Sequence, residues 1–182
     1  MPDTNAAQQV VPVNEVADRL RMFGGAYKEA NPFGGPADWP DDGKHVVVVK
    51  GMTIKPGNIR MGDMQFNGMV ARFQYQLVDD PERETPRSWS GAPFKFPSDD
   101  DFRRLPENHQ GGIRADQDRF SGFAQQITGN ATKDLPTDAS AILNEINSGR
   151  TLLMRINVTS RPNKTNPNRP WKTDYAVERL PE

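Results

Sequence analysis

The stretch RTLLMRINVTSRPNKTNPNRPWKTDYAVERL, residues 150–180, contains two strand-like runs on either side of a long loop. Residues 152–159 alternate between two sets of side chains, which indicates a strand whose successive side chains point to opposite faces of a sheet. Residues 172–180 form the second run. Proline and asparagine fill the segment 161–170 and favour turns over regular structure. The stretch therefore predicts an antiparallel hairpin with a long loop.

The predicted hairpin is basic, although the chain as a whole is not. Residues 150–182 carry a formal charge of +4, whereas the whole chain has a net charge of −1. Trp171 lies beside the basic loop, and single-stranded nucleic acids are bound by cations that contact phosphates and by rings that stack on bases. Because the remainder of the chain is acidic, such binding would depend on this local positive surface.

The composition indicates one domain with long connections. A chain of 182 residues, with 35% hydrophobic residues and 16 prolines, is long enough for a single core. We expect a tail with a short helix at 14–23 and a Pro/Gly-rich connection over residues 1–41, followed by a domain at 42–182. No apolar run of about 18 residues and no leader pattern is present, and cysteine is absent. These features predict a cytoplasmic protein without membrane contact.

Three further strands are expected in the first half of this domain. Four consecutive valines in the segment 43–50 favour a strand, and clean alternation favours a second over 66–78. Between them, the segment 55–62 contains proline and glycine and is expected to be a loop. After an acidic turn at 79–87, a third strand over 89–96 is interrupted by Gly91 and Pro93.

Two amphipathic helices are expected before the hairpin. In the segment 116–127, apolar residues recur at helical spacing and Gly129 follows as a stop signal. The segment 138–147 repeats this pattern and is followed by Gly149. The order is therefore three strands, two helices and two strands. This order is typical of the OB-fold, a partly open five-stranded barrel that binds oligonucleotides with strands two and three and the one-two and four-five loops.

The sequence also resembles the single-stranded DNA-binding proteins of bacteriophages. The likeness rests on the opening segment 42–47, on Phe73 and Tyr75, and on the closing segment 171–175. It implies an OB-type barrel that binds single-stranded DNA largely independently of sequence and protects it in the host cytoplasm during phage DNA replication or recombination. It also implies self-association or contacts with other replication proteins. The acidic tail through which many such proteins recruit partners is not seen up to Glu182.

The candidate nucleic-acid contacts fall into three groups, each with a plain structural alternative. The cations either bind phosphate or keep the loops soluble; the polar residues of the second strand either line a groove or form an ordinary solvated face; the rings either stack on bases or complete the core. For Trp171 the alternative is a plug at the barrel end. Core positions are favoured for Phe73 and Tyr75. The predicted contacts are Lys55, Arg60, Arg161, Lys164, Arg169 and Lys172; Arg72 and Gln74; and Trp89, Phe94 and Trp171.

Catalytic patterns are weak. His45 and His109 have no companion at metal-ligand spacing, and Asp99 to Asp101 are more typical of a solvated charge run than of a magnesium site. The phosphate-binding loops and the nucleophile elbow of known enzyme classes are missing from the sequence. We therefore predict a protein that is not an enzyme and needs no metal or cofactor.

A structural or assembly protein of a virion, which would use its hairpin and its N-terminal arm for subunit contacts, is the alternative from another class. The Pro/Gly-rich arm from Gly24 to Pro40 favours it, because such arms often become ordered on a partner.

Overall fold

The computed structural model describes residues 39–78 and 86–181, which belong to one compact unit spanning residues 37–182. The predicted helix at 14–23, nearly all of the connection before residue 41 and most of the acidic turn lie outside the described residues. None of the helices in the described part of the chain has the length and apolar character that a membrane span requires.

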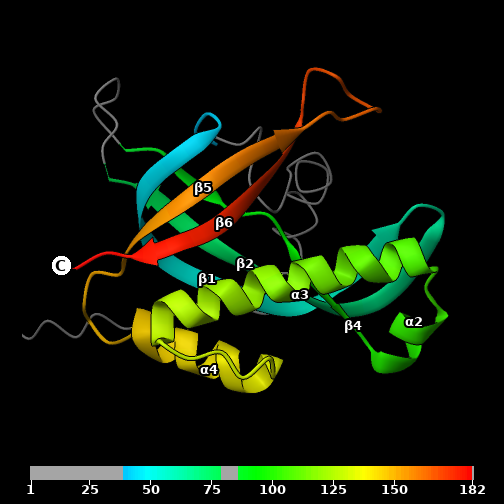
Figure 1. Cartoon of the computed structure of the whole chain (residues 1–182), viewed down its shortest axis with the longest axis horizontal. Helices are drawn as coiled ribbons and strands as arrows, with labels where there is room; N and C mark the ends of the chain where they lie inside the picture. Colours follow the sequence, from blue (N-terminus) through cyan, green and yellow to red (C-terminus); the bar gives the residue numbers. More distant parts are fainter. Residues whose placement is uncertain (1–38, 79–85, 182) are drawn as a thin grey trace, which may run out of the picture. The chain divides into compact units, whose positions relative to one another are not determined.

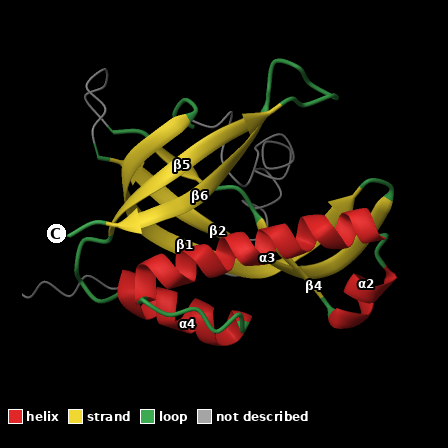
Figure 2. Cartoon of the chain, in the orientation of Figure 1, coloured by secondary structure: helices red, strands yellow, loops and turns green. Residues whose placement is uncertain are grey.

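The fold is mainly β, as predicted, and is built on one antiparallel sheet of six strands. The strand order is β3-β2-β1-β5-β6, and β4 also pairs with β2 (Figure 1 and Figure 2). Strands β1, β2 and β3 are consecutive in the sequence and adjacent in the sheet, and the same is true of β5 and β6. The pairing of β1 with β5 joins these two parts into one sheet. The strands are β1 (Gly43–Met61), β2 (Met64–Leu77), β3 (Ser88–Ser90), β4 (Phe94–Pro97), β5 (Leu153–Arg161) and β6 (Trp171–Arg179).

The predicted loop at 55–62 is wrong, because β1 continues through it and turns only at Gly62 and Asp63. Pro56 cannot donate a ladder hydrogen bond, and it is tolerated because β5 pairs with β1 only as far as Val48. Among the described strands, β2 alone pairs with this distal part of β1. We call residues 53–72 the β1–β2 arm.

The predicted third strand consists of two short strands, β3 and β4, that both pair with β2. The break falls where the sequence places glycine and proline. A Cβ on Gly91 would lie 2.6 Å from Asp174 Oδ2 and 2.8 Å from Tyr75 Cε2, so this position has no room for a larger residue. The sheet therefore has six strands rather than the five predicted.

Three helices precede β5 in the described residues, whereas two were predicted: α2 (Asp99–Arg104), α3 (Glu107–Thr128) and α4 (Leu135–Ile146). The Ser98 hydroxyl caps α2 by accepting from the Asp101 backbone N–H, and the three aspartates of its first turn suit the positive end of the helix dipole. The start of α3 was missed because its glycines weaken the helical pattern. The tip of the β1–β2 arm lies against this first part of α3: a Cβ added at Gly112 would be 3.4 Å from the Met61 Cε methyl group.

The core lies between the sheet and α3, which crosses the sheet in Figure 1. Phe73 of β2 packs against Phe123 of α3 with ring centroids 4.7 Å apart, and Tyr75 is buried beside them. The predicted core positions of Phe73 and Tyr75 are confirmed. Burial of each such side chain contributes on the order of 1.5–3 kcal/mol.

The two edges of the sheet are joined through a side chain. The backbone N–H of Ala92, between β3 and β4, donates to Asp174 Oδ1 on β6 over 2.8 Å. In the described residues β6 forms no ladder with β3 or β4. The OB-fold barrel therefore stays a prediction, while the antiparallel sheet with a few helices is established.

Candidate nucleic-acid interface

The β5–β6 hairpin carries the most exposed large hydrophobic side chain in the described part of the chain. Trp171 opens β6, pairs across the hairpin with Arg161, and is 64% exposed. Alternation along β6 explains this exposure, because Trp171, Thr173 and Tyr175 share one face while Asp174 on the opposite face is completely buried. Trp171 is therefore not a core plug, and its ring is accessible.

The hairpin loop has turn structure of its own. The Asn163 side-chain oxygen accepts from the backbone N–H groups of Thr165 and Asn166 over 3.0 and 3.1 Å, and Arg169 N–H donates to the Asn166 carbonyl. Lys164 and Arg169, two of the predicted phosphate contacts, are exposed on this loop. Together with Arg161 and Trp171 they form the part of the predicted site that the structure brings together.

Lys172 has a different environment from its neighbours. Its ammonium donates to the Pro40 carbonyl over 2.6 Å and lies 3.9 Å from Asp42 Oδ1. Asp42 also accepts hydrogen bonds from the backbone and hydroxyl of Ser160. This predicted phosphate contact instead holds the segment before β1 against the hairpin.

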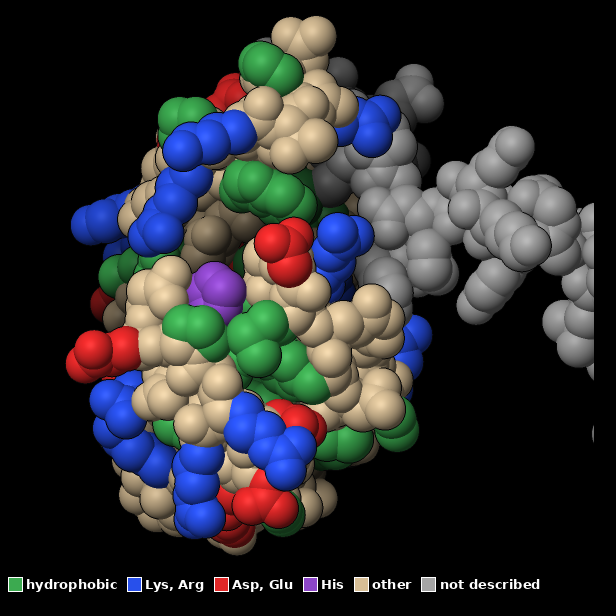
Figure 3. All heavy atoms as spheres, turned by 90° about the vertical axis from the view of Figure 1, so that its right-hand side faces the viewer, with side chains coloured by type: hydrophobic (Ala, Val, Ile, Leu, Met, Phe, Trp, Pro, Cys, Tyr) green, Lys and Arg blue, Asp and Glu red, His purple; other side chains and the backbone are tan. Residues whose placement is uncertain are grey.

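Lys55 and Arg60 lie on the β1–β2 arm rather than in a loop, and both are exposed. The Arg60 guanidinium donates to the Gly62 carbonyl at the arm's turn. In Figure 1 the arm and the β5–β6 loop both reach the right-hand side of the view. Figure 3 faces that side and shows Lys and Arg side chains in several separate groups, with hydrophobic side chains, acidic side chains and one histidine between them.

Arg72 and Gln74 differ in their availability. The Arg72 guanidinium is half-buried and donates to the Gly91 carbonyl over 3.0 Å, so it supports the break between β3 and β4. Burial lowers the pKa of Arg72, and the negative charge of Asp174 opposes this shift. Gln74 is exposed on β2, and its side-chain oxygen lies close to Gly51 of β1, 3.2 Å from where a Cβ added to this glycine would be. Of the two, Gln74 has the more accessible side chain.

Trp89 and Phe94 are core residues, and their predicted role in base stacking is wrong. Trp89 is 6% exposed and packs between Tyr75 and Trp39, with centroid distances of 5.3 and 6.1 Å. Phe94 is completely buried, 3.9 Å beneath the Arg119 guanidinium. Both strands direct these rings inward because each residue pairs with an inward-facing position of β2.

The face of the hairpin that carries Trp171 includes residues that sequence reasoning did not select. Tyr175 is 36% exposed, and it pairs with Asn157 of β5, which in turn pairs with Lys44 of β1. Alternation from Trp171 would have identified Tyr175, whereas Lys44 required the pairing of β1 with β5. We call this surface the hairpin face, formed by Lys44, Asn157, Thr159, Arg161, Trp171, Thr173 and Tyr175.

Metal-binding geometry is not present in the described ranges, where no three His, Asp or Glu side chains gather to hold an ion. His45 Nε2 lies 2.7 Å from the Asp41 carbonyl oxygen, and His109 lies against the turn at Gly62. The three consecutive aspartates belong to the first turn of α2.

No protein-family model matches this sequence, and the comparisons with curated proteins and with solved structures each found no significant match.

Proposed function

We propose that this protein binds single-stranded DNA, largely independently of sequence, through the hairpin face. The observation that carries the proposal is the exposed Trp171 paired with Arg161 at the base of a loop that presents Lys164 and Arg169. An indole stacked on a base contributes about 1–3 kcal/mol and tolerates any base, since every base has a π-face.

The charge of the loop supports the same ligand. The segment 161–171 contains three Lys or Arg residues and no acidic residue. Each phosphate that such a cation neutralises releases a counterion, so binding weakens as salt rises. An exposed ring beside basic residues with no acidic residue among them fits single-stranded DNA better than a duplex, because the bases of a duplex are already stacked on one another.

The finer fold assignment is part of this proposal. We infer an OB-type barrel whose edges meet through Asp174 and Ala92, so that the β5–β6 loop is the four-five loop, one of the two that bind oligonucleotides in that fold. The corresponding biological role is protection of single-stranded DNA during phage replication or recombination.

A fluorescence titration with oligo(dT) tests the proposal. Trp39 and Trp89 pack against each other and Trp171 is exposed, so binding should quench chiefly the Trp171 emission. We expect a log–log salt slope near −2, at about −0.7 for each of three neutralised phosphates, and weaker binding to duplex DNA. Trp171→Phe should remove most of the quenching.

Two results would contradict the proposal: no binding to a long oligo(dT), or binding that does not respond to salt. Oligo(rU) in a parallel titration measures the preference for DNA over RNA. Light scattering without nucleic acid provides the comparison with a virion assembly protein, which should form large oligomers unaided.

A further inference from the structure

The hairpin face carries two exposed rings on one strand. Trp171 and Tyr175 are four residues apart on β6, which places them about 13 Å apart along the strand at about 3.3 Å per residue. Between them lies Thr173, whose partner across the hairpin is Thr159. Two short side chains therefore separate two large rings on the same face.

Each ring belongs to a row of side chains that also contains a cation. Trp171 pairs directly with Arg161. Tyr175 pairs with Asn157, and Asn157 pairs with Lys44, which is exposed. The combination of ring and cation thus occurs twice, on either side of the threonine pair.

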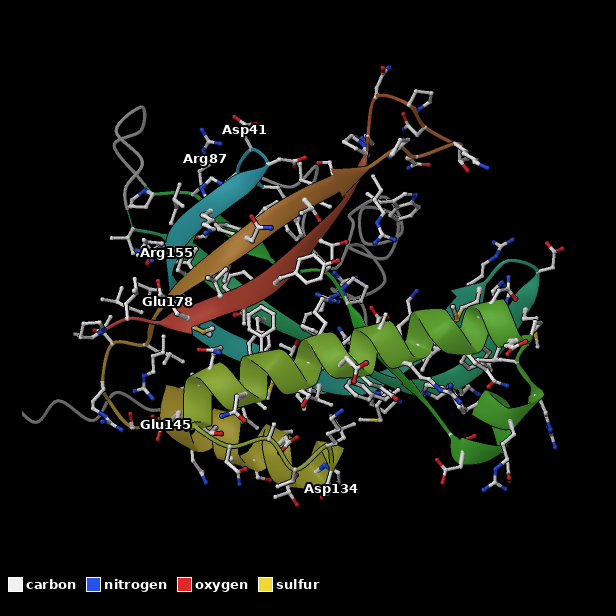
Figure 4. The ribbon with its side chains drawn as sticks, in the orientation of Figure 1. Asp41, Arg87, Asp134, Glu145, Arg155 and Glu178 are labelled. Atoms are coloured by element: carbon white, nitrogen blue, oxygen red, sulfur yellow. The ribbon has the colours of Figure 1, made fainter. Side chains whose placement is uncertain are left out.

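The basic character of the face changes directly after Tyr175. In the next row Arg155 is paired with Glu178, and the two side chains form an ion pair. Figure 4 labels both residues on their neighbouring strands. A register shift between Arg155 and Ile156 also interrupts the regular pairing here. Because Glu178 neutralises the charge of Arg155, this row attracts a phosphate group more weakly than the rows of Trp171 and Tyr175 do.

We propose that Tyr175 is a second base-stacking position, so that a single strand follows β6 with one base on Trp171 and another on Tyr175. Arg161 and Lys44 contact the phosphates beside the two bases, and the intervening nucleotide lies over Thr159 and Thr173. The Asn157 amide, beside the Tyr175 ring, offers both a donor and an acceptor to the edge of the second base. This inference rests on the proposed function and adds to it a fixed spacing between two base positions.

The test uses oligonucleotides that carry two thymines separated by an increasing number of abasic positions. With the unchanged protein, affinity should pass through a maximum at one separation, because only then do both thymines reach a ring. Tyr175→Ala should remove the maximum and weaken binding at that separation about tenfold, within the range for one stacked base. Tyr175→Phe keeps the ring and should retain the maximum.

Val78→Ala is the matched control, since it shortens an exposed apolar side chain at the end of β2 and should leave the whole profile unchanged. An affinity independent of thymine separation, or the same maximum in Tyr175→Ala as in the unchanged protein, overturns the second position. In both cases continued salt-dependent binding of oligo(dT) leaves the proposed function intact. Failure of oligo(dT) itself to bind overturns the proposed function as well.

Discussion

The Arg119 guanidinium on α3 donates to Asp174 Oδ1 on β6 over 3.1 Å, and the two side chains are 5% and 0% exposed. The same carboxylate accepts from the Tyr75 hydroxyl over 2.6 Å and from Ala92 N–H over 2.8 Å. Arg119 also donates to the Pro93 carbonyl over 2.7 Å. One buried charge pair thus joins a helix to both edges of the sheet, directly beneath the strand that exposes Trp171 and Tyr175.

Asp174→Asn should destabilise the protein by up to about 3–5 kcal/mol, because it leaves the buried Arg119 charge with only the partly exposed Asp116 carboxylate, 3.4 Å away, as its counter-ion. Urea unfolding followed by circular dichroism measures the loss. Asp118→Asn, which breaks the exposed pair with Lys133, is the control and should cost less than about 1 kcal/mol. Equal effects of the two variants would show that the buried pair has no special role.

Stability should fall as the pH rises above about 10, the ordinary pKa of tyrosine. Burial, and next the charge of Asp174, raise the pKa of Tyr75 well above this value. The unfolded chain therefore loses the Tyr75 proton in a range where the folded chain keeps it, so folding is progressively disfavoured. Urea midpoints across this range should decline less steeply in Tyr75→Phe than in the unchanged protein.

Tyr75→Phe should also lower stability at neutral pH by about 1.5–3 kcal/mol, since it removes a hydrogen bond to a charged group. Tyr175→Phe is the control for the measurement at neutral pH, because the Tyr175 ring is exposed and this substitution should leave stability nearly unchanged. A decline as steep in Tyr75→Phe as in the unchanged protein would assign the alkaline effect to other groups.

Trp171→Ala should weaken oligo(dT) binding about tenfold while leaving the melting temperature nearly unchanged, because the ring is exposed. The comparison is Trp89→Ala, which removes a buried ring and should cost about 3–5 kcal/mol of stability. A large drop in the melting temperature of Trp171→Ala would assign its ring to packing.

Replacing Arg161, Lys164 and Arg169 together by glutamine should make the log–log salt slope less steep by about 2, at about 0.7 per lost phosphate contact. Arg103→Gln with Arg104→Gln, on the exposed end of α2, is the control and should leave the slope unchanged. An unchanged slope in the triple variant would locate the phosphate contacts elsewhere.

Gly91→Ala should destabilise the protein by about 1–3 kcal/mol, because the new Cβ would overlap Asp174 Oδ2 and the Tyr75 ring. Gly122→Ala is the control: nothing lies within 4 Å of its Cβ position, and alanine in a helix should stabilise by roughly 0.5–1 kcal/mol. Thermal unfolding of both variants checks the prediction, and a Gly91→Ala protein as stable as the unchanged one would refute it.

Local patterns in the sequence predicted the elements whose signals are local. Alternation identified β2 and β5, β6 was expected as the second run of the hairpin, and the loop at 161–170 was recognised from its prolines and asparagines. Pro56 and Gly57 predicted a loop where β1 continues as a strand. That strand exists because β2 pairs along its whole length, a contact between segments that turn-forming residues do not reveal.

The sequence by itself determined which side chains share a face: Trp171 with Tyr175 on one side of β6, and Asp174 on the other. Only the tertiary structure decided which face is covered. Asp174 is buried because Arg119, Tyr75 and Ala92 converge on it from distant parts of the chain, and Trp89 and Phe94 are buried because β3 and β4 pair with inward-facing positions of β2. Alternation has a period set by the backbone, whereas burial depends on which segments pack together, and so the exposure of Trp171 followed from the packing of the whole sheet.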